Sequence, residues 1–329
     1  MPTVTRLIWS YCRWQLCVAR WGRPLLFFTI WPLFAVICLG FLLAQRGFPD
    51  PGFWPAAEKL NYFIIFPALL LSNLADSPVR ELEVLRLGGA AIVIIVIATC
   101  SLFIFRFFHA VPAARFGPVL QGTVRFNTYL GLSILTTLAG PLGVERAALY
   151  LAVAVPLVNV LSIAALTDYG NRRSFRLILL TILRNPLIIA CILGVTLAFT
   201  SIGLPFGVGG FLHLLSQGSL PLGLLCVGAA LQPEALRRDA LVLGSTGALR
   251  LLAMPVLAAS VGYLFGLKGV EALVLVVFSA IPTAPTSYVL TRHMNGDGML
   301  MAGIVTSQTL FAIITIPLIL WIFSFQETC

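Results

Sequence analysis

Two prolines with hydroxyl side chains around them mark the residues best suited to chemistry, in the stretch SAIPTAPTSYVL. Pro282 and Pro285 stand three residues apart, beside Thr283, Thr286 and Ser287. Proline lacks a backbone donor and its ring clashes with a preceding carbonyl, so a helix must open at this point. The freed backbone groups and the three hydroxyls can hold a small polar ligand. A kink whose polar groups are satisfied by neighbouring helices is the alternative interpretation.

A second polar stretch, QGTVRFNTYLGLS, offers amide, hydroxyl and guanidinium groups that complement the first. Its candidate ligand-binding residues are Arg125, Asn127, Thr128, Gly131 and Ser133. It contains glycine but no proline, so the sequence predicts its opening less directly than that of the proline-bearing stretch. Two interrupted helices that meet would form one polar site.

Two charged residues inside apolar runs are further candidates. Arg125 and Arg250 lie in apolar surroundings. Ionisable residues inside a membrane are functional candidates by default, and a guanidinium can bind a carboxylate through two parallel hydrogen bonds. Both are therefore candidates for the substrate path, where they would suit a carboxylate; the alternative is that they reach out to the membrane interface. Ser72 and Asn73, which follow Pro67, either face the same site or bond to a neighbouring helix.

Other chemistries have little support in the sequence. The seven cysteines and three histidines are scattered, with no CxxC pair and no metal-ligand spacing. The sequence has no HExxH, no GxSxG and no deep pair of acids, so an intramembrane enzyme is the least favoured class. We expect no cofactor and no metal. The basic residues are dispersed along loop ends, which argues against nucleic acid as a partner.

The elements that must position these residues are membrane helices. The chain of 329 residues is 59% hydrophobic and 10% charged, with a mean hydropathy of +1.00. Soluble domains carry roughly 25% charged residues, and a membrane span needs about 20 apolar residues. The apolar runs predict an all-α membrane protein with ten transmembrane helices, near residues 26–44, 57–76, 87–108, 118–139, 147–166, 177–199, 211–232, 241–265, 272–291 and 299–324.

Basic residues in the loops predict the orientation of the chain. If the loop at residues 167–176 is cytoplasmic, ten basic loop residues lie on that side and four on the other, which satisfies the positive-inside rule. Residues 1–24 then lie outside, although they hold four arginines and no acid. An interfacial amphipathic helix and a disordered basic tail both fit this segment.

The two halves of the chain resemble each other. Residues 33–44 (LFAVICLGFLLA) and 187–198 (LIIACILGVTLA) share five identical positions at an offset of 154, and Pro67 and Pro221 share the same offset. We therefore predict two five-helix repeats, residues 25–166 and 177–325. An odd number of spans inverts the second repeat, as in many secondary transporters. Chance similarity between leucine-rich helices is the alternative.

Six segments jointly resemble the auxin efflux carrier family: LNYFIIFPALLLSNLAD, QGTVRFNTYLGLS, LRNPLIIACILGV, LPLGLLCVGAALQP, ALRLLAMPVLAASVGYLFGL and SAIPTAPTSYVLTRHMNGDG. The likeness covers roughly residues 26–324. It implies a ten-span transporter with two inverted repeats, in which broken helices 4 and 9 cross. It also implies a carboxylate cargo, such as auxin in plants or malate and malonate in bacteria, and therefore a place in the inner (plasma) membrane of a bacterium.

The resemblance assigns roles to particular positions. The family's crossover positions fall on Asn127, Thr128, Gly131 and Pro282. Ser133 stands where the family usually has a proline, so the depth of the break in the fourth span stays open. Pro285 and Thr286 stand where many relatives have other residues, so the contacts to the ligand can differ from theirs.

The sequence therefore predicts a secondary transporter that moves a small organic anion by alternating access around the crossing of helices 4 and 9. A sodium-coupled symporter of the bile-acid type is the alternative, although no oxygen-rich cation cluster is visible. The expected partners are the organic anion and the lipid bilayer. The GxxxG pattern of Gly262 and Gly266 serves either internal packing or a homodimer contact.

Overall fold

The computed structural model describes residues 25–75, 82–167, 186–200, 204 and 207–323. Over these ranges every regular element is helical and none is a strand, which confirms the all-helical class. Residues 1–24, nearly all of the predicted cytoplasmic loop at 167–176 and the start of the second predicted repeat lie outside the described residues.

The helices follow one another with short turns. Those of the first half are α2 (Leu25–Gln45), α3 (Phe53–Leu60), the π-helical turn η1 (Asn61–Ile65), α4 (Phe66–Ala75), α5 (Leu82–His109), α6 (Ala113–Val124) and α7 (Thr128–Leu166). Those of the second half are α9 (Pro186–Thr200), α10 (Val208–Ser216), α11 (Ser219–Ala229), the 3-10 turn η2 (Pro233–Arg237), α12 (Ala240–Ala248), the π-helical turn η3 (Leu249–Ala253), α13 (Met254–Leu264), α14 (Gly269–Ala280), α15 (Thr286–His293) and α16 (Gly298–Ile322).

Several helical segments can cross a membrane. Six of those described are long and apolar enough by themselves: residues 28–45, 85–109, 113–166, 208–229, 240–264 and 298–322. This number is smaller than the ten predicted runs for physical reasons. The 113–166 segment contains two of the runs, α14 has only 12 helical residues, and the run at 57–76 is not among the six. Much of the run at 177–199 lies outside the described residues.

The long segment α7 is bent sharply at Gly140. Its backbone there has φ 58° and ψ −145°, in a region that glycine adopts without steric cost. A β-carbon at this position would meet nothing within 4 Å, so the backbone angle, not crowding, favours glycine here. The two parts of α7 therefore act as separate rods, the second of which begins with Pro141.

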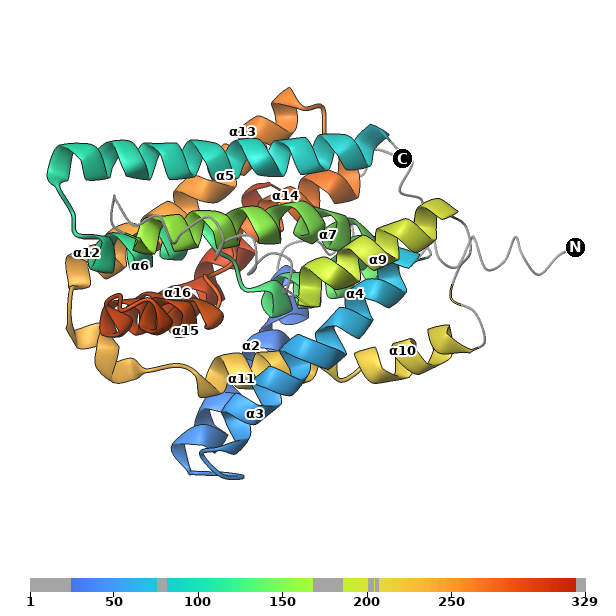
Figure 1. Cartoon of the computed structure of the whole chain (residues 1–329), viewed down its shortest axis with the longest axis horizontal. Helices are drawn as coiled ribbons and strands as arrows, with labels where there is room; N and C mark the ends of the chain where they lie inside the picture. Colours follow the sequence, from blue (N-terminus) through green and yellow to red (C-terminus); the bar gives the residue numbers. More distant parts are fainter. Residues whose placement is uncertain (1–24, 76–81, 168–185, 201–203, 205–206, 324–329) are drawn as a thin grey trace, which may run out of the picture.

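Two helix pairs pack backbone against backbone. In the contact of α2 with α11, a β-carbon on Gly40 would lie 2.1 Å from the carbonyl oxygen of Leu225, and one on Gly228 would lie 1.9 Å from that of Ile37. In the contact of α9 with α4, a β-carbon on Gly194 would lie 2.6 Å from Cβ of Leu74. Figure 1 shows α9 lying along α4, and α11 beside α2. Small residues permit such close approach between membrane helices.

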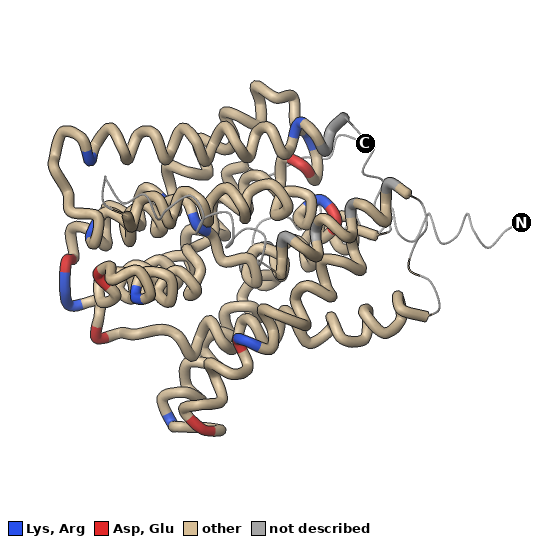
Figure 2. Tube along the Cα trace, in the orientation of Figure 1, with Lys and Arg blue, Asp and Glu red and all other residues tan. Residues whose placement is uncertain are grey.

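Charged residues lie mainly at the ends and turns of the helices, and the helix middles are largely uncharged (Figure 2). At one end of the molecule Arg115 forms an ion pair with Asp239, and the amide of Asp297 donates to the carbonyl of Ala114 at 2.8 Å. The turns α5–α6, η2–α12 and α15–α16 therefore meet at the same end.

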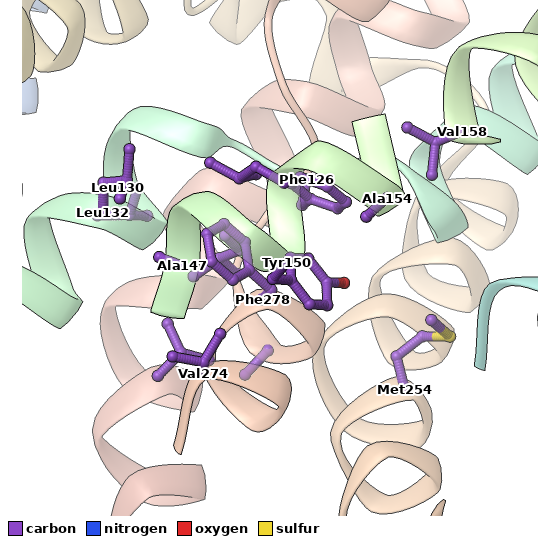
Figure 3. Packing of buried hydrophobic residues seen from close by; sticks show 14 of the residues in the cluster. Phe126, Leu130, Leu132, Ala147, Tyr150, Ala154, Val158, Met254, Val274 and Phe278 are labelled. Carbon is purple, nitrogen blue, oxygen red and sulfur yellow. The ribbon is translucent and has the colours of Figure 1, made fainter. Parts of the chain in front are cut away.

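The core combines an aromatic cluster with a buried ion pair. The rings of Tyr150 and Phe278 stack with centroids 4.6 Å apart, and Phe126 packs on Phe278 at 5.2 Å (Figure 3). In addition, Nε of Arg146 lies 3.2 Å from a carboxylate oxygen of Glu271, with the two side chains 6% and 13% exposed. Both features join α7 to α14.

Candidate functional site

Two interruptions of helical structure meet inside the molecule. The first separates α6 from α7 at residues 125–127, and the second separates α14 from α15 at residues 281–285. The amide of Asn127 donates to the carbonyl of Pro282 at 2.8 Å. The backbone of one break is therefore bonded directly to the backbone of the other.

The break in the fourth predicted span needs no proline. Asn127 caps the new helix, because its Oδ1 accepts from the amide of Leu130 at 3.2 Å, and asparagine is among the preferred residues for this position. Arg125 has an extended backbone, with φ −78° and ψ 156°. Ser133, where the resemblance expects proline, lies inside regular helix, and its buried hydroxyl has no partner among the described residues. The break thus lies before Ser133 and is independent of it.

Thr283 bonds the second break to two neighbouring helices, α16 and α6. The amide of Thr283 donates to Oε1 of Gln308 at 3.0 Å, and its hydroxyl donates to the carbonyl of Gln121 at 3.1 Å. The hydroxyls of Thr283 and Ser287 are 3.3 Å apart. All these groups are buried, so Thr283 and Ser287 hold the crossing together and do not line a cavity.

Gln308 of α16 is a cross-link that the sequence did not reveal. Besides accepting from Thr283, it donates through Nε2 to the carbonyls of Gly122 at 2.9 Å and Thr246 at 3.3 Å. It therefore bonds to α6, α12 and the break before α15. The only signal in the sequence is a glutamine inside an apolar span.

Arg250 is a second cross-link. Its side chain is fully buried, on the π-helical turn η3. Nε donates to the carbonyl of Ile281 at 2.7 Å, Nη1 donates to that of Thr123 at 3.0 Å, and Nη2 donates to that of Phe278. These carbonyls lie at the C-terminal ends of α6 and α14, where the helix dipoles are negative. The guanidinium was predicted to face the ligand, and the structure shows it bonded to three backbone oxygens.

Arg125 lies at the crossing itself. Its guanidinium donates to Oε1 of Gln121 at 3.2 Å and to the hydroxyl of Thr286 at 3.4 Å. Both partners are neutral, and no carboxylate of the described chain forms an ion pair with it. The cationic group therefore bridges the two breaks with its charge uncompensated.

A small cavity of about 40 Å³ opens beside the crossing. A volume of this size holds only a few water molecules. Of the predicted site residues it is lined by four, at the N-terminal ends of α7 and α15: Asn127, Thr128, Pro285 and Thr286. The remaining lining residues are Glu58, Tyr62, Phe66, Tyr129, Leu187, Gly223, Cys226, Val227 and Ala284.

The electrostatics of this cavity favour a negative ligand near the crossing. The first-turn amides of a helix have no carbonyl partner in their own helix and carry partial positive charge, and here two such ends converge. Since Oδ1 of Asn127 is fixed by its capping bond, Nδ2 faces another way. That Nδ2 is buried and has no acceptor among the described residues. Helix N-termini are common sites for anions. In α15 the amides of Ser287 and Tyr288 already donate to the carbonyls of Ala284 and Pro285, so the free donor is Nδ2 of Asn127.

The other predicted site residues lie away from the cavity. A β-carbon on Gly131 would be 2.6 Å from the ring of Phe278, so this glycine allows α7 to pack on α14. Pro282 contributes its carbonyl to the crossing. Ser72 and Asn73 donate to the carbonyl of Leu69 in their own helix, at 3.1 and 2.7 Å. Both interpretations of Ser72 and Asn73 are therefore wrong: neither residue lines the cavity, and both bond to their own helix instead of a neighbouring one.

Sequence reasoning missed most of the cavity wall. Glu58 stands at the second position of the predicted span 57–76, and an acid there is a signal that could have been used. Tyr62, Tyr129 and Cys226 were indistinguishable from packing residues, because only the fold brings α3, η1, α7 and α11 together.

Comparisons with known proteins indicate a membrane transport protein. A protein family described as "Membrane transport protein" matches residues 165–320. An uncharacterized transporter of Methanothermobacter thermautotrophicus is 30% identical over 134 residues, and the match covers 40% of this chain but only 44% of that relative. An uncharacterized transporter of Methanocaldococcus jannaschii is 26% identical over 284 residues, or 81% of this chain and 89% of the relative.

Residues 165–320, just under half of the chain, match the auxin efflux carrier family. The family match begins at the end of α7 and runs into α16, so it includes α14, the break and α15. Auxin efflux carriers are membrane transport proteins, so the family assignment makes this chain an integral membrane protein and a transporter, not an enzyme. The resemblance drawn from the sequence is confirmed.

Proposed function

We propose that the protein is a secondary transporter of a small organic anion, and that the anion binds in the cavity at the crossing. The observation that supports this best is a cavity lined by the N-terminal ends of two helices and by Asn127, whose buried Nδ2 has no partner among the described residues. The uncompensated guanidinium of Arg125, bonded to Thr286 at the cavity wall, adds a full positive charge nearby. A carboxylate supplies the matching acceptors.

The fold that we propose is a pair of inverted five-helix repeats with ten spans, residues 25–166 and 177–325. Helix packing supports it. Gly40 meets Leu225 where α2 contacts α11, and Gly194 lies 3.5 Å, measured from its added β-carbon, from the carbonyl oxygen of Leu71 where α9 contacts α4. Gly194 corresponds to Gly40, and Leu225 corresponds to Leu71, in each case by the offset of 154. Each repeat thus docks its first helix on the second helix of the other.

Transport requires the cavity to change size. Ligand pockets usually measure about 300–1,000 Å³, whereas this one holds about 40 Å³. The structure therefore corresponds to a closed conformation without room for a dicarboxylate. Alternating access around a central site would open the cavity to one side of the membrane at a time.

The decisive experiment replaces Asn127 by aspartate. Aspartate still caps α7, but it exchanges the free donor for a negative acceptor. Because a hydrogen bond to a charged group contributes about 1.5–3 kcal/mol, we expect the affinity of the folded protein for malate to fall at least roughly tenfold. Binding is measured by isothermal titration calorimetry on purified protein, and transport by labelled malate uptake into proteoliposomes.

Asn73→Asp is the matched control, because Asn73 bonds only to its own helix. Wild-type affinity of Asn127→Asp for malate, malonate and indole-3-acetate would contradict the assignment of the site. Uptake that requires sodium would instead favour a symporter of the bile-acid type, so each assay is run in sodium and in choline buffer.

A further inference from the structure

Glu58 places an acid in the wall of the anion cavity. It lies in the last turn of α3 and is half-buried. It lines the cavity together with Asn127, Thr128, Pro285 and Thr286. Among the described residues that line the cavity, it is the only one that is ordinarily charged at neutral pH.

No cation balances this acid. Its carboxylate has no hydrogen bond or ion pair with any residue that the structure describes. The titratable groups that face it are Cys226 of α11, Tyr129 of α7 and Tyr62 of η1, all ordinarily neutral. Lys59 on its own helix is exposed. The guanidinium at the crossing, that of Arg125, is bonded to Gln121 and Thr286 instead.

The end of α3 is held firmly in this position. The helix passes directly into the π-helical turn η1, and such turns are common at functional sites. Nδ2 of Asn61 donates to the carbonyl of Ser219 at 2.9 Å, and the hydroxyl of Ser219 donates to Oδ1 of Asn61 at 3.0 Å. This reciprocal, buried pair ties η1 to the start of α11. Glu58 therefore cannot leave the cavity by a local movement of its helix.

A carboxylate ligand and the Glu58 carboxylate are incompatible in one small cavity. Two negative charges that share a site with little water repel each other, and the usual resolution is that one of them binds a proton. Proton uptake by Glu58 would also turn a repelling acceptor into a hydrogen-bond donor for the ligand.

We propose that Glu58 is the proton-coupling group of the transporter, so that one proton and one organic anion occupy the cavity together. Glu58 takes the proton from water on the side where the anion enters and returns it to water on the side where the anion leaves. No other group changes its protonation, and each cycle carries one negative charge less than the anion alone. This inference rests on the proposed function, because it assumes an anion in the cavity.

The test is the number of protons taken up when malate binds. It is measured by calorimetry in buffers of different ionisation enthalpy, at several values between pH 6 and pH 8. For the wild type we expect uptake of up to one proton per malate at the upper end of this range, where Glu58 is ionised in the empty protein. The apparent Kd then weakens as pH rises, approaching tenfold per unit.

In E58Q the side chain cannot ionise, so we expect a Kd that follows only the ionisation of malate itself. E58D retains an acid and should retain proton uptake. D50N, at an exposed turn beyond α2, serves as the control for loss of an acid and should match the wild type. If E58Q fails to fold, proton uptake by the wild type and by E58D still decides the question.

Different failures separate the two proposals. Malate binding to the wild type without proton uptake, or an equal pH dependence in E58Q, overturns the role of Glu58 and leaves the anion site intact. Failure of the wild type to bind malate, malonate and indole-3-acetate at any pH contradicts the proposed function, and proton coupling falls with it.

Discussion

Asn127 performs two separate tasks because the two ends of its amide face different ways. Its oxygen caps α7 on the amide of Leu130, and its nitrogen is left without an acceptor beside the cavity. The capping bond fixes the side chain before any ligand arrives, so little rotamer entropy is lost on binding. Asparagine supplies both a cap and a separate free donor, which an ionised aspartate cannot do at this position.

Arg250 shows how a charge can serve the site without touching its ligand. Its three hydrogen bonds hold the C-terminal ends of α6 and α14, from which the chain enters the two breaks. Arg250 is therefore a positioning residue, since Nε, Nη1 and Nη2 each donate to a backbone carbonyl.

The prediction at this scale concerns Arg250→Lys. Lysine keeps the charge but cannot bond three carbonyls in the planar geometry of a guanidinium. Loss of even one bond from a charged donor costs about 2 kcal/mol, so we expect a clearly lower melting temperature. The Kd of the folded fraction for malate should change less than twofold. Arg237→Lys, at an exposed turn, is the control. An unchanged melting temperature with a weakened Kd would place Arg250 in contact with the ligand.

Single residues could be predicted from the sequence only where their effect is local. Pro282 and Pro285 open a helix whatever surrounds them, so the second break follows from covalent structure. Gln308, Arg250 and Glu58 act on segments far along the chain, and only the packed fold decides which carbonyls or cavities they reach. For this reason the sequence predicts a ligand contact for Arg250 and gives no role to Glu58.

The helices themselves are predictable because apolar runs are a local property, while their interruptions and pairings are less so. The break before Thr128 has no proline, and it forms where the Asn127 cap and the bond to Pro282 replace helical hydrogen bonds. The bend of α7 at Gly140 follows from one positive φ angle. The offset of 154 pointed to the repeats, but the contacts of α2 with α11 and of α4 with α9 emerge only in three dimensions.

The prediction at this scale concerns the two close helix contacts. Gly40→Ala puts a methyl group 2.1 Å from a carbonyl oxygen, and Gly194→Ala puts one 2.6 Å from another side chain. Overpacking of this kind costs about 1–3 kcal/mol, so both variants should melt at lower temperatures. Gly244→Ala in α12 is the matched control, because nothing lies within 4 Å of its added carbon. It should be neutral or stabilising by up to about 1 kcal/mol.

Melting is followed by tryptophan fluorescence in one detergent. If Gly194→Ala melts like Gly244→Ala while Gly40→Ala does not, the two contacts are unequal and the repeats are not docked in the same way.

The whole molecule separates its charges between its two ends. Arg115 and Asp239 pair at one end, where the turns with Arg237 and Arg238 also lie. Lys268 precedes α14, at the end of the molecule opposite to the turn between α15 and α16. The orientation expected from the loop charges places the first end in the cytoplasm.

The prediction at this scale concerns that orientation. In a variant whose native cysteines are replaced by serine or alanine, Lys268→Cys should react with a membrane-impermeant maleimide in intact bacterial spheroplasts. Arg238→Cys should react only after permeabilisation. Both positions are exposed, so reactivity reports the side of the membrane. The reverse pattern would invert the topology, and equal labelling of both would contradict a span between them.

The hydrogen bonds among the broken helices restrict how the molecule can move. The guanidinium of Arg250, the amide of Gln308 and the bond from Asn127 to Pro282 fasten α6, α7, α14 and α15 into one unit. To part them would strip several buried carbonyls of their donors at once. Any motion that enlarges the cavity must therefore shift this cruciform unit as a block, sliding it against the wall formed by α3, η1 and α11.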